Sequence, residues 1–160
     1  MGESSAMSEI QLIQDPPRRY VGIRRKLPVT ELAPFYAEVF PKVMGWLAQK
    51  GIQPASMPIS VWCDMDMETG VADCHAGCFV SQEVEVEGEF STGETTGGDV
   101  LKLVHTGGYD TMGQSWGRVY ARAKELGRAP GAGFEIYVDD PGQVDAAQLR
   151  TEIYLPLAPT

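Results

Sequence analysis

The chain repeats one order of predicted elements: a strand, a helix and two more strands. In the first half, apolar residues recur at three- and four-residue steps over 31–50, which predicts an amphipathic helix. Runs of β-forming residues at 19–25, 59–63 and 71–81 predict the strands around it. A repeated unit constrains the fold strongly, because each copy must bury its apolar face in the same way.

The second half of the chain repeats this order. A strand is expected at 100–105, a helix at 111–126, and strands at 134–138 and 151–157. The sequence therefore predicts an α+β domain of duplicated strand-helix-strand-strand units, with an antiparallel sheet and pseudo-two-fold symmetry around a central cleft. Clefts of this kind are common ligand sites.

A single domain is expected over residues 18–157, with repeats at about 18–82 and 99–157. Residues 1–17 are interpreted as an N-terminal lead-in that is disordered at its start, over Met1 to Ser8. A length of 160 residues is enough for one domain with its own hydrophobic core.

The net charge limits the partners that this protein can have. The 22 acidic residues outnumber the 13 basic ones, for a net charge of -9. Nucleic-acid binding relies on basic patches that displace counterions from phosphates, so direct DNA or RNA binding is not expected. An acidic balance fits cationic partners better, although it also serves solubility.

The expected location follows from targeting signals and cysteines. No apolar run approaches the roughly 18 residues of a membrane span, and the N-terminus lacks the basic and apolar blocks of a signal peptide. The odd set of cysteines, Cys63, Cys74 and Cys78, favours reduced thiols. We therefore expect a cytoplasmic protein with no membrane partner.

The tripeptide Glu-Ile-Tyr occurs twice, at 135–137 and 152–154, in the last two predicted strands. Side chains alternate between the two faces of a strand, so each copy sets its Glu and Tyr opposite its Ile. We expect the face of Phe134 and Ile136 to lie under the helix, and the face of Glu135 to look away from it. The second copy is expected to present its carboxylate on the equivalent face.

Two segments near the end resemble the end of GyrI-like effector-binding domains: Phe-Glu-Ile-Tyr-Val-Asp-Asp-Pro at 134–141 and Leu-Arg-Thr-Glu-Ile-Tyr-Leu-Pro-Leu at 149–157. Further features fit the same family: His-Thr-Gly-Gly-Tyr at 105–109, the helix through Trp116 and Tyr120, and Val-Gly-Ile at 21–23. The resemblance covers about residues 18–157 and rests on the order and spacing of these short motifs.

This resemblance implies a duplicated fold that binds small molecules, frequently lipophilic cations, between its halves. In bacteria, such domains also serve as the ligand domains of multidrug-responsive and AraC-type transcription regulators. The acidic residue of the family's Glu-x-Tyr strand falls on Glu135, and aromatic side chains line the cleft. Unlike the regulators, the chain has no helix-turn-helix segment, so a freestanding domain is expected.

The predicted site depends on Glu135. Among aromatic walls its carboxylate would attract a cation, with cation–π contacts of about 0.5–2 kcal/mol per ring. Partial desolvation would also make Glu135 a candidate general base or nucleophile, and thus the catalytic residue if the protein is an enzyme. The alternative is a solvent-facing strand glutamate. The predicted ligand-binding residues are Glu135, Tyr137, Trp116, Tyr109, Trp62 and Tyr154.

The aromatic members of this set have an ordinary alternative role as cover for a sheet. Trp116 in particular lies on the apolar stripe of its helix, where a core position is the default.

A metal or cofactor is not expected. Cys74 and Cys78 flank His75, but four residues of extended strand place the two cysteines about 13 Å apart, too far to share one ion. Asp64, Asp66 and Glu68 resemble the start of a calcium loop but lack its glycine and its final glutamate, so a polar hairpin turn is expected instead.

Three functions remain open from the sequence. The leading hypothesis is a small-molecule binding domain for a cationic or amphipathic ligand. The second is a hydrolase of reactive small molecules that uses Glu135 as base or nucleophile. The third is a protein-interaction module, such as a gyrase modulator, whose protein partner the sequence does not identify.

Overall fold

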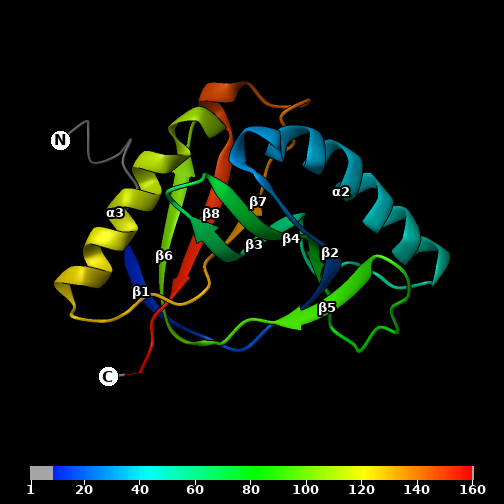
Figure 1. The fold of residues 1–160 in the computed structure, drawn as a ribbon, viewed down its shortest axis with the longest axis horizontal. Helices are drawn as coiled ribbons and strands as arrows, with labels where there is room; N and C mark the ends of the chain where they lie inside the picture. The colour runs from blue at the N-terminus through cyan, green and yellow to red at the C-terminus, as the bar shows by residue number, and fades with distance from the viewer. Residues whose placement is uncertain (1–8, 160) are drawn as a thin grey trace. The chain divides into compact units, whose positions relative to one another are not determined.

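The computed structural model describes residues 9–159, which form eight β-strands and two α-helices (Figure 1). Two compact units divide the chain. Unit 2 spans residues 17–95, and unit 1 combines the residues up to 16 with those from 96 onward. The disorder predicted for Met1 to Ser8 lies outside the described residues.

Unit 2 consists of four antiparallel strands and one helix. Its strands follow the order β3-β4-β2-β5. Helix α2, which follows the short 3-10 turn η1 (Val29–Glu31), lies against β2 and β4 (Figure 1). The elements are β2 (Arg19–Pro28), α2 (Leu32–Gln49), β3 (Ile59–Asp66), β4 (Val71–Phe79) and β5 (Phe90–Glu94). The predicted apolar stripe is confirmed, because α2 buries Phe35, Val39, Val43 and Leu47.

Unit 1 likewise consists of four strands and one α-helix. Its strands follow the order β1-β6-β8-β7 and are antiparallel. Helix α3 begins after the 3-10 turn η2 (Tyr109–Thr111) and lies against β6 and β8 (Figure 1). The elements are β1 (Gln11–Asp15), β6 (Gly98–Thr106), α3 (Met112–Glu125), β7 (Phe134–Tyr137), the 3-10 turn η3 (Ala146–Gln148) and β8 (Arg150–Pro156).

The strand orders of the two units correspond. Read as β3-β4-β2-β5 and β7-β8-β6-β1, both place a hairpin first, then the strand that precedes the helix, then an edge strand. In each unit the helix covers a core on one face of its strands. The predicted α+β class, with duplicated strand-helix-strand-strand units and antiparallel strands, is confirmed.

The edge strands β1 and β5 are elements that the sequence pattern did not predict. Strand β1 lies within the residues interpreted as a lead-in and pairs with β6, while β5 lies between the two predicted repeats and pairs with β2. In the acidic run 83–89, glutamates alternate with valines, a pattern that predicts one solvated strand face, and this prediction is wrong. Its residues form no strand, and Glu87 and Glu89 lie near Lys50 and Lys42 of the α2 segment.

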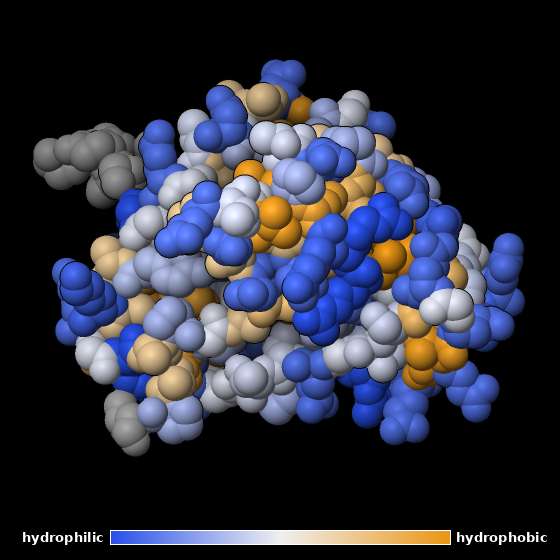
Figure 2. Space-filling view, in the orientation of Figure 1, coloured by the Kyte–Doolittle hydropathy of each residue, from blue (hydrophilic) through white to orange (hydrophobic). Residues whose placement is uncertain are grey.

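No helix within residues 9–159 is both long enough and apolar enough to cross a membrane. Hydrophilic side chains (blue) cover much of the face shown in Figure 2, and apolar areas (orange) lie between them.

His75 is a buried ionisable group on β4 of unit 2. Its ring is 3% exposed and packs edge-on against Tyr20, with ring centroids 4.7 Å apart. Its Nε2 lies 2.9 Å from the Ser91 hydroxyl and 3.2 Å from the Ser91 carbonyl oxygen, whereas Nδ1 has no hydrogen-bond partner in the described part of the chain. Burial lowers the pKa of His75 to about 4.

This burial predicts a loss of stability on mild acidification. The unfolded chain binds a proton at His75 below about pH 6.5, whereas the folded protein does so only near pH 4, so protonation favours unfolding in this window. Between pH 6.5 and pH 5 the free energy of unfolding should fall by about 1.6 kcal/mol through this residue. Urea unfolding at both pH values measures the change. A His75→Asn variant should lose much less, and an equal loss in both proteins would refute the assignment.

Candidate functional site

Glu135 on β7 is buried, with 4% of its surface exposed, and both of its carboxylate oxygens accept hydrogen bonds. The indole Nε1–H of Trp116 donates to Oε2 at 2.6 Å, and the Tyr137 hydroxyl donates to Oε1 at 2.5 Å. A buried carboxylate is costly unless it is hydrogen-bonded, and hydrogen bonds to a charged acceptor are short and strong. The three side chains therefore form one connected polar group.

The face on which Glu135 lies corrects the prediction. Glu135 was expected to look away from the helix, but it pairs with Ile153, whose side chain belongs to the core under α3. Residues directly opposite in an antiparallel pair share a face, so Glu135 lies on the helix side, where Trp116 of α3 reaches it. The alternation of residues does not say which face of β7 meets the helix, because both faces of this strand are buried. Phe134 on one face and Glu135 on the other are both buried.

The two copies of Glu-Ile-Tyr lie on opposite faces, which overturns the expectation of equivalent faces. The register pairs Glu135 with Ile153 and Ile136 with Glu152, so the copies are offset by one residue. In the second copy the Tyr154 hydroxyl donates to Glu152 at 2.7 Å, and the Tyr154 ring stacks on Phe134. Tyr154, predicted to bind ligand with Glu135, is therefore on the other side of the strands.

Tyr109 joins the Glu135 group from the turn before α3. Its ring meets that of Tyr137 edge-on, with centroids 5.8 Å apart, and it is 44% exposed. Burial raises the pKa of Tyr109, and the charge of Glu135 raises it further. We call Tyr109, Trp116, Glu135 and Tyr137 the Glu135 cluster. It contains four of the six predicted ligand-binding residues.

His105 fixes the turn that carries Tyr109. Its Nε2 lies 3.0 Å from the Gly108 carbonyl oxygen and 3.1 Å from the Thr111 hydroxyl, and its Nδ1 lies 2.6 Å from the Ser115 hydroxyl. Because a carbonyl only accepts, Nε2 carries the hydrogen and the Ser115 hydroxyl donates to Nδ1. His105 therefore joins β6 to the start of α3.

Gly133 makes room for the Trp116 indole. A Cβ at this position would lie 2.6 Å from Cη2 of Trp116 and 3.2 Å from the Tyr154 carbonyl oxygen. Any side chain here would displace the indole from Glu135. Sequence reasoning did not single out this residue, although a glycine immediately before a strand is a signal of close approach by another group.

Trp62, the remaining predicted ligand residue, belongs to unit 2. It lies on β3 opposite Cys74 and packs against the core under α2. Its part in ligand binding stays a prediction.

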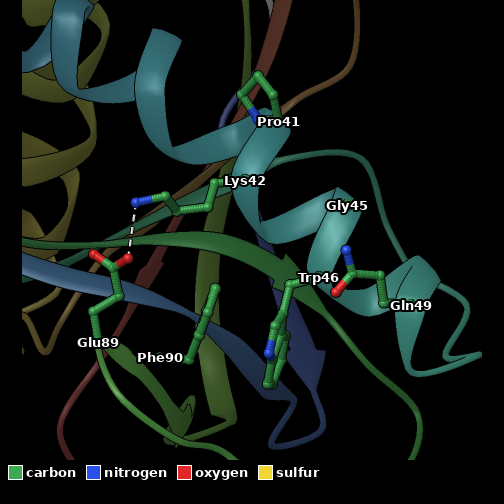
Figure 3. Close-up of a pocket in the computed structure, with 7 residues that line it drawn as sticks. All are labelled: Pro41, Lys42, Gly45, Trp46, Gln49, Glu89 and Phe90. Atoms are coloured by element: carbon green, nitrogen blue, oxygen red, sulfur yellow. Dashed lines mark hydrogen bonds and ion pairs between the residues drawn. The ribbon is translucent and has the colours of Figure 1, made fainter.

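A groove of about 310 Å³ is present on unit 2, between α2 and the residues that begin β5 (Figure 3). Trp46 and Phe90 stack there, with ring centroids 4.2 Å apart, and Lys42 forms an ion pair of 2.8 Å with Glu89. The groove contains none of the six predicted ligand-binding residues.

Metal ligands do not gather in residues 9–159: no group of three or more histidine, cysteine and acidic side chains is placed to hold an ion. Of the three acidic residues that resemble a calcium loop, Asp64 and Asp66 lie at the end of β3 and Glu68 lies in the turn to β4. The Asp66 carboxylate accepts hydrogen bonds from the backbone N–H groups of Glu68 and Thr69 in this turn. The expected polar hairpin turn is confirmed.

Fold and sequence together define a small-molecule binding domain. The family model of the GyrI-like small molecule binding domain matches residues 8–158, nearly the whole chain, and the protein belongs to this family. The resemblance drawn from the sequence is thereby confirmed. A search of curated protein sequences finds no significant match.

Solved structures of related fold include three with informative descriptions. The EcmrR–DNA complex is 16% identical with a TM-score of 0.80, covering 99% of this chain and 61% of the other, so this chain spans less than two thirds of EcmrR. A hydrolase encoded by lin2189 from Listeria innocua is 10% identical, with a TM-score of 0.63 and coverage of 98% and 95%. SAV2435 bound to tetraphenylphosphonium is 13% identical, with a TM-score of 0.62 and coverage of 94% and 93%. At these identities the likeness concerns the fold.

The hydrogen bond from Trp116 to Glu135 predicts a large effect of a small substitution. Trp116→Phe keeps an aromatic ring but removes the donor to a buried carboxylate oxygen, so the free energy of unfolding should fall by about 1.5–3 kcal/mol. Trp46→Phe is the matched control, because that indole stacks on Phe90 and should lose less than about 1 kcal/mol. Urea unfolding compares the two variants. If both variants lose the same free energy of unfolding, the hydrogen bond from Trp116 to Glu135 does not contribute the stability expected of it.

Proposed function

We propose that the protein binds a cationic or amphipathic organic molecule at the Glu135 cluster of unit 1. The observation that carries this proposal is a 4% exposed carboxylate that receives hydrogen bonds from an indole and a phenol. Both donors are neutral, so they stabilise the ionised carboxylate without cancelling its charge. In a poorly solvated environment, that charge attracts a cation more strongly than it would in water.

The rings of the cluster supply the second element of recognition. Tyr137 and Trp116 are half-buried, and Tyr109 is 44% exposed, so their faces are partly accessible. Aromatic faces attract cations, with about 0.5–2 kcal/mol for each well-placed ring. Tyr120 extends the aromatic surface along α3, with its ring centroid 5.7 Å from that of Trp116.

The comparisons support this class of ligand. The family to which the chain belongs is described as a small-molecule binding domain, and SAV2435, which shares the fold, has been solved with tetraphenylphosphonium. This ligand combines one positive charge with four aromatic groups. It therefore matches a buried carboxylate among aromatic rings and is a suitable first probe.

Glu135→Gln should weaken tetraphenylphosphonium binding by about 10- to 100-fold, since an amide of the same shape removes the charge. Isothermal titration calorimetry at pH 7 measures the dissociation constant. Glu152→Gln is the matched control, because this residue stands in the second Glu-Ile-Tyr copy, accepts a hydrogen bond from its own tyrosine and lies on the opposite face. It should leave the affinity unchanged.

Two results would count against the proposal. Equal losses in the two variants would indicate an effect of total charge, and unchanged affinity in Glu135→Gln would exclude this carboxylate as the anchor. Circular dichroism of each variant separates a loss of binding from a loss of folding.

A second candidate function is hydrolysis of a reactive small molecule. The 2.5 Å contact between Glu135 and the Tyr137 hydroxyl favours it, because a carboxylate beside a phenol can act as base or nucleophile with a proton donor at hand. The fold shared with the Listeria innocua hydrolase gives it further support.

Turnover separates the two candidates. If the protein is a hydrolase, activated esters or epoxides should be consumed, activity should vanish in Glu135→Gln, and Tyr137→Phe should lower kcat by about 10²-fold or more. Product formation followed by chromatography provides the measurement. Cation binding without turnover across such a panel would reject hydrolysis and leave the binding function.

A further inference from the structure

Unit 2 contains a counterpart of the Glu135 cluster. Helix α3 carries Trp116 and Tyr120 four residues apart, with ring centroids 5.7 Å apart. Helix α2 carries Tyr36 and Phe40 at the same spacing, with stacked rings 5.1 Å apart. In each helix the first of the two aromatic residues is the fifth residue of the helix.

The strand below each helix completes the correspondence. Glu135 is the second residue of β7, and Ser60 is the second residue of β3. The Trp116 indole donates to Glu135 at 2.6 Å, and the Tyr36 hydroxyl lies 2.7 Å from the Ser60 hydroxyl. Each helix thus uses the polar atom of its aromatic residue to contact the same position of the equivalent strand.

Two residues further along, both strands carry an aromatic ring on the same face. In unit 1 this is Tyr137, and in unit 2 it is Trp62. Trp62 pairs with Cys74, which belongs to the core under α2, so Trp62 lies on the helix side as Tyr137 does. We call Tyr36, Phe40, Ser60 and Trp62 the Ser60 cluster.

The two clusters differ in charge. Where unit 1 has a carboxylate, unit 2 has the Ser60 hydroxyl, which also lies 2.9 Å from the Cys74 thiol. The Tyr36 hydroxyl, the Ser60 hydroxyl and the Cys74 thiol form a buried or half-buried chain of neutral groups. Above this chain, the rings of Tyr36, Phe40 and Trp62 are half-buried and keep partly accessible surface.

We propose that the Ser60 cluster is a second ligand site, which takes an uncharged aromatic group. Stacking on Tyr36, Phe40 and Trp62 supplies the attraction, and the neutral chain below gives a cation no advantage over an uncharged ring. This inference takes the Glu135 cluster as its template and so rests on the function proposed for it. It adds a ligand class that the carboxylate site does not select.

Binding of 2-naphthol, which is uncharged at pH 7, tests the proposal. The protein has three tryptophans, and the indole N–H resonances of Trp46, Trp62 and Trp116 can be assigned in ¹H–¹⁵N spectra with Trp46→Phe and Trp116→Phe. Titration should shift the Trp62 resonance with saturation. The same shift should persist in Glu135→Gln, because this substitution removes only the carboxylate of the Glu135 cluster.

Variants of the second helical ring sharpen this test. Phe40→Ala should weaken the binding of 2-naphthol observed at Trp62 by about 5- to 10-fold. If this variant does not fold, Phe40→Leu takes its place, because leucine keeps the apolar bulk but removes the ring. Phe90→Ala is the matched control, because Phe90 stacks on Trp46 in the groove of Figure 3. It should leave the Trp62 titration unchanged.

A gain-of-function variant tests the difference in charge. Ser60→Glu, introduced together with Glu135→Gln, places a carboxylate next to the Tyr36 hydroxyl and should restore tetraphenylphosphonium binding at Trp62. A folded double variant that binds no tetraphenylphosphonium would refute the equivalence of the two clusters.

The result with 2-naphthol stands apart from the function proposed for unit 1. An unshifted Trp62 resonance in the folded wild-type protein overturns the second site, whatever Glu135→Gln does to tetraphenylphosphonium binding. A Trp62 titration that Phe40→Leu leaves unchanged overturns it as well. Conversely, if Glu135→Gln binds tetraphenylphosphonium as tightly as the wild-type protein, only the site proposed at the Glu135 cluster is overturned.

Discussion

A buried carboxylate that is satisfied by neutral donors is the interaction on which the site depends. Leaving Glu135 ionised at 4% exposure requires hydrogen bonds, and the Trp116 indole and the Tyr137 hydroxyl provide them. One donor comes from the helix and the other from the same strand, so the carboxylate also fixes α3 over β7. Gly133 permits this contact because it leaves space for the indole.

The duplicated fold carries two clusters that share a layout and differ in charge. Both units place an aromatic pair on the helix and a polar residue second in the strand below it. The scaffold sets these positions through the strand order that the units share. A single exchange of carboxylate for hydroxyl, at Glu135 and Ser60, then separates a charged cluster from a neutral one.

The sequence predicts the helices and paired strands well because their apolar spacing is regular. It predicts neither β1 nor β5, since Gln11–Asp15 and Phe90–Glu94 show no sustained alternation of apolar and polar residues. Strand sidedness also fails, for a physical reason. When both faces of β7 are buried, alternation does not say which face meets the helix, and only pairing with Ile153 decides it.

Glu135 itself could be named from the sequence because a family motif falls on it, whereas its partners follow from tertiary contacts. Nothing in the helix pattern distinguishes a tryptophan in the core from one whose indole N–H reaches a carboxylate 19 residues away. The second Glu-Ile-Tyr copy makes the same point. The two tripeptides are identical in sequence, yet their glutamates lie on opposite faces of the paired strands, which only the register of β7 and β8 determines.

A crystal structure of the protein with tetraphenylphosphonium tests the central claim most directly. The phosphonium centre should lie beside the Glu135 carboxylate, with phenyl groups against Trp116, Tyr137 and Tyr109. Neighbouring aromatic rings should move to admit the ligand, while the Glu135 carboxylate stays on the helix side of β7. A ligand bound instead beside Glu152, or in the groove of Trp46 and Phe90, would contradict the account.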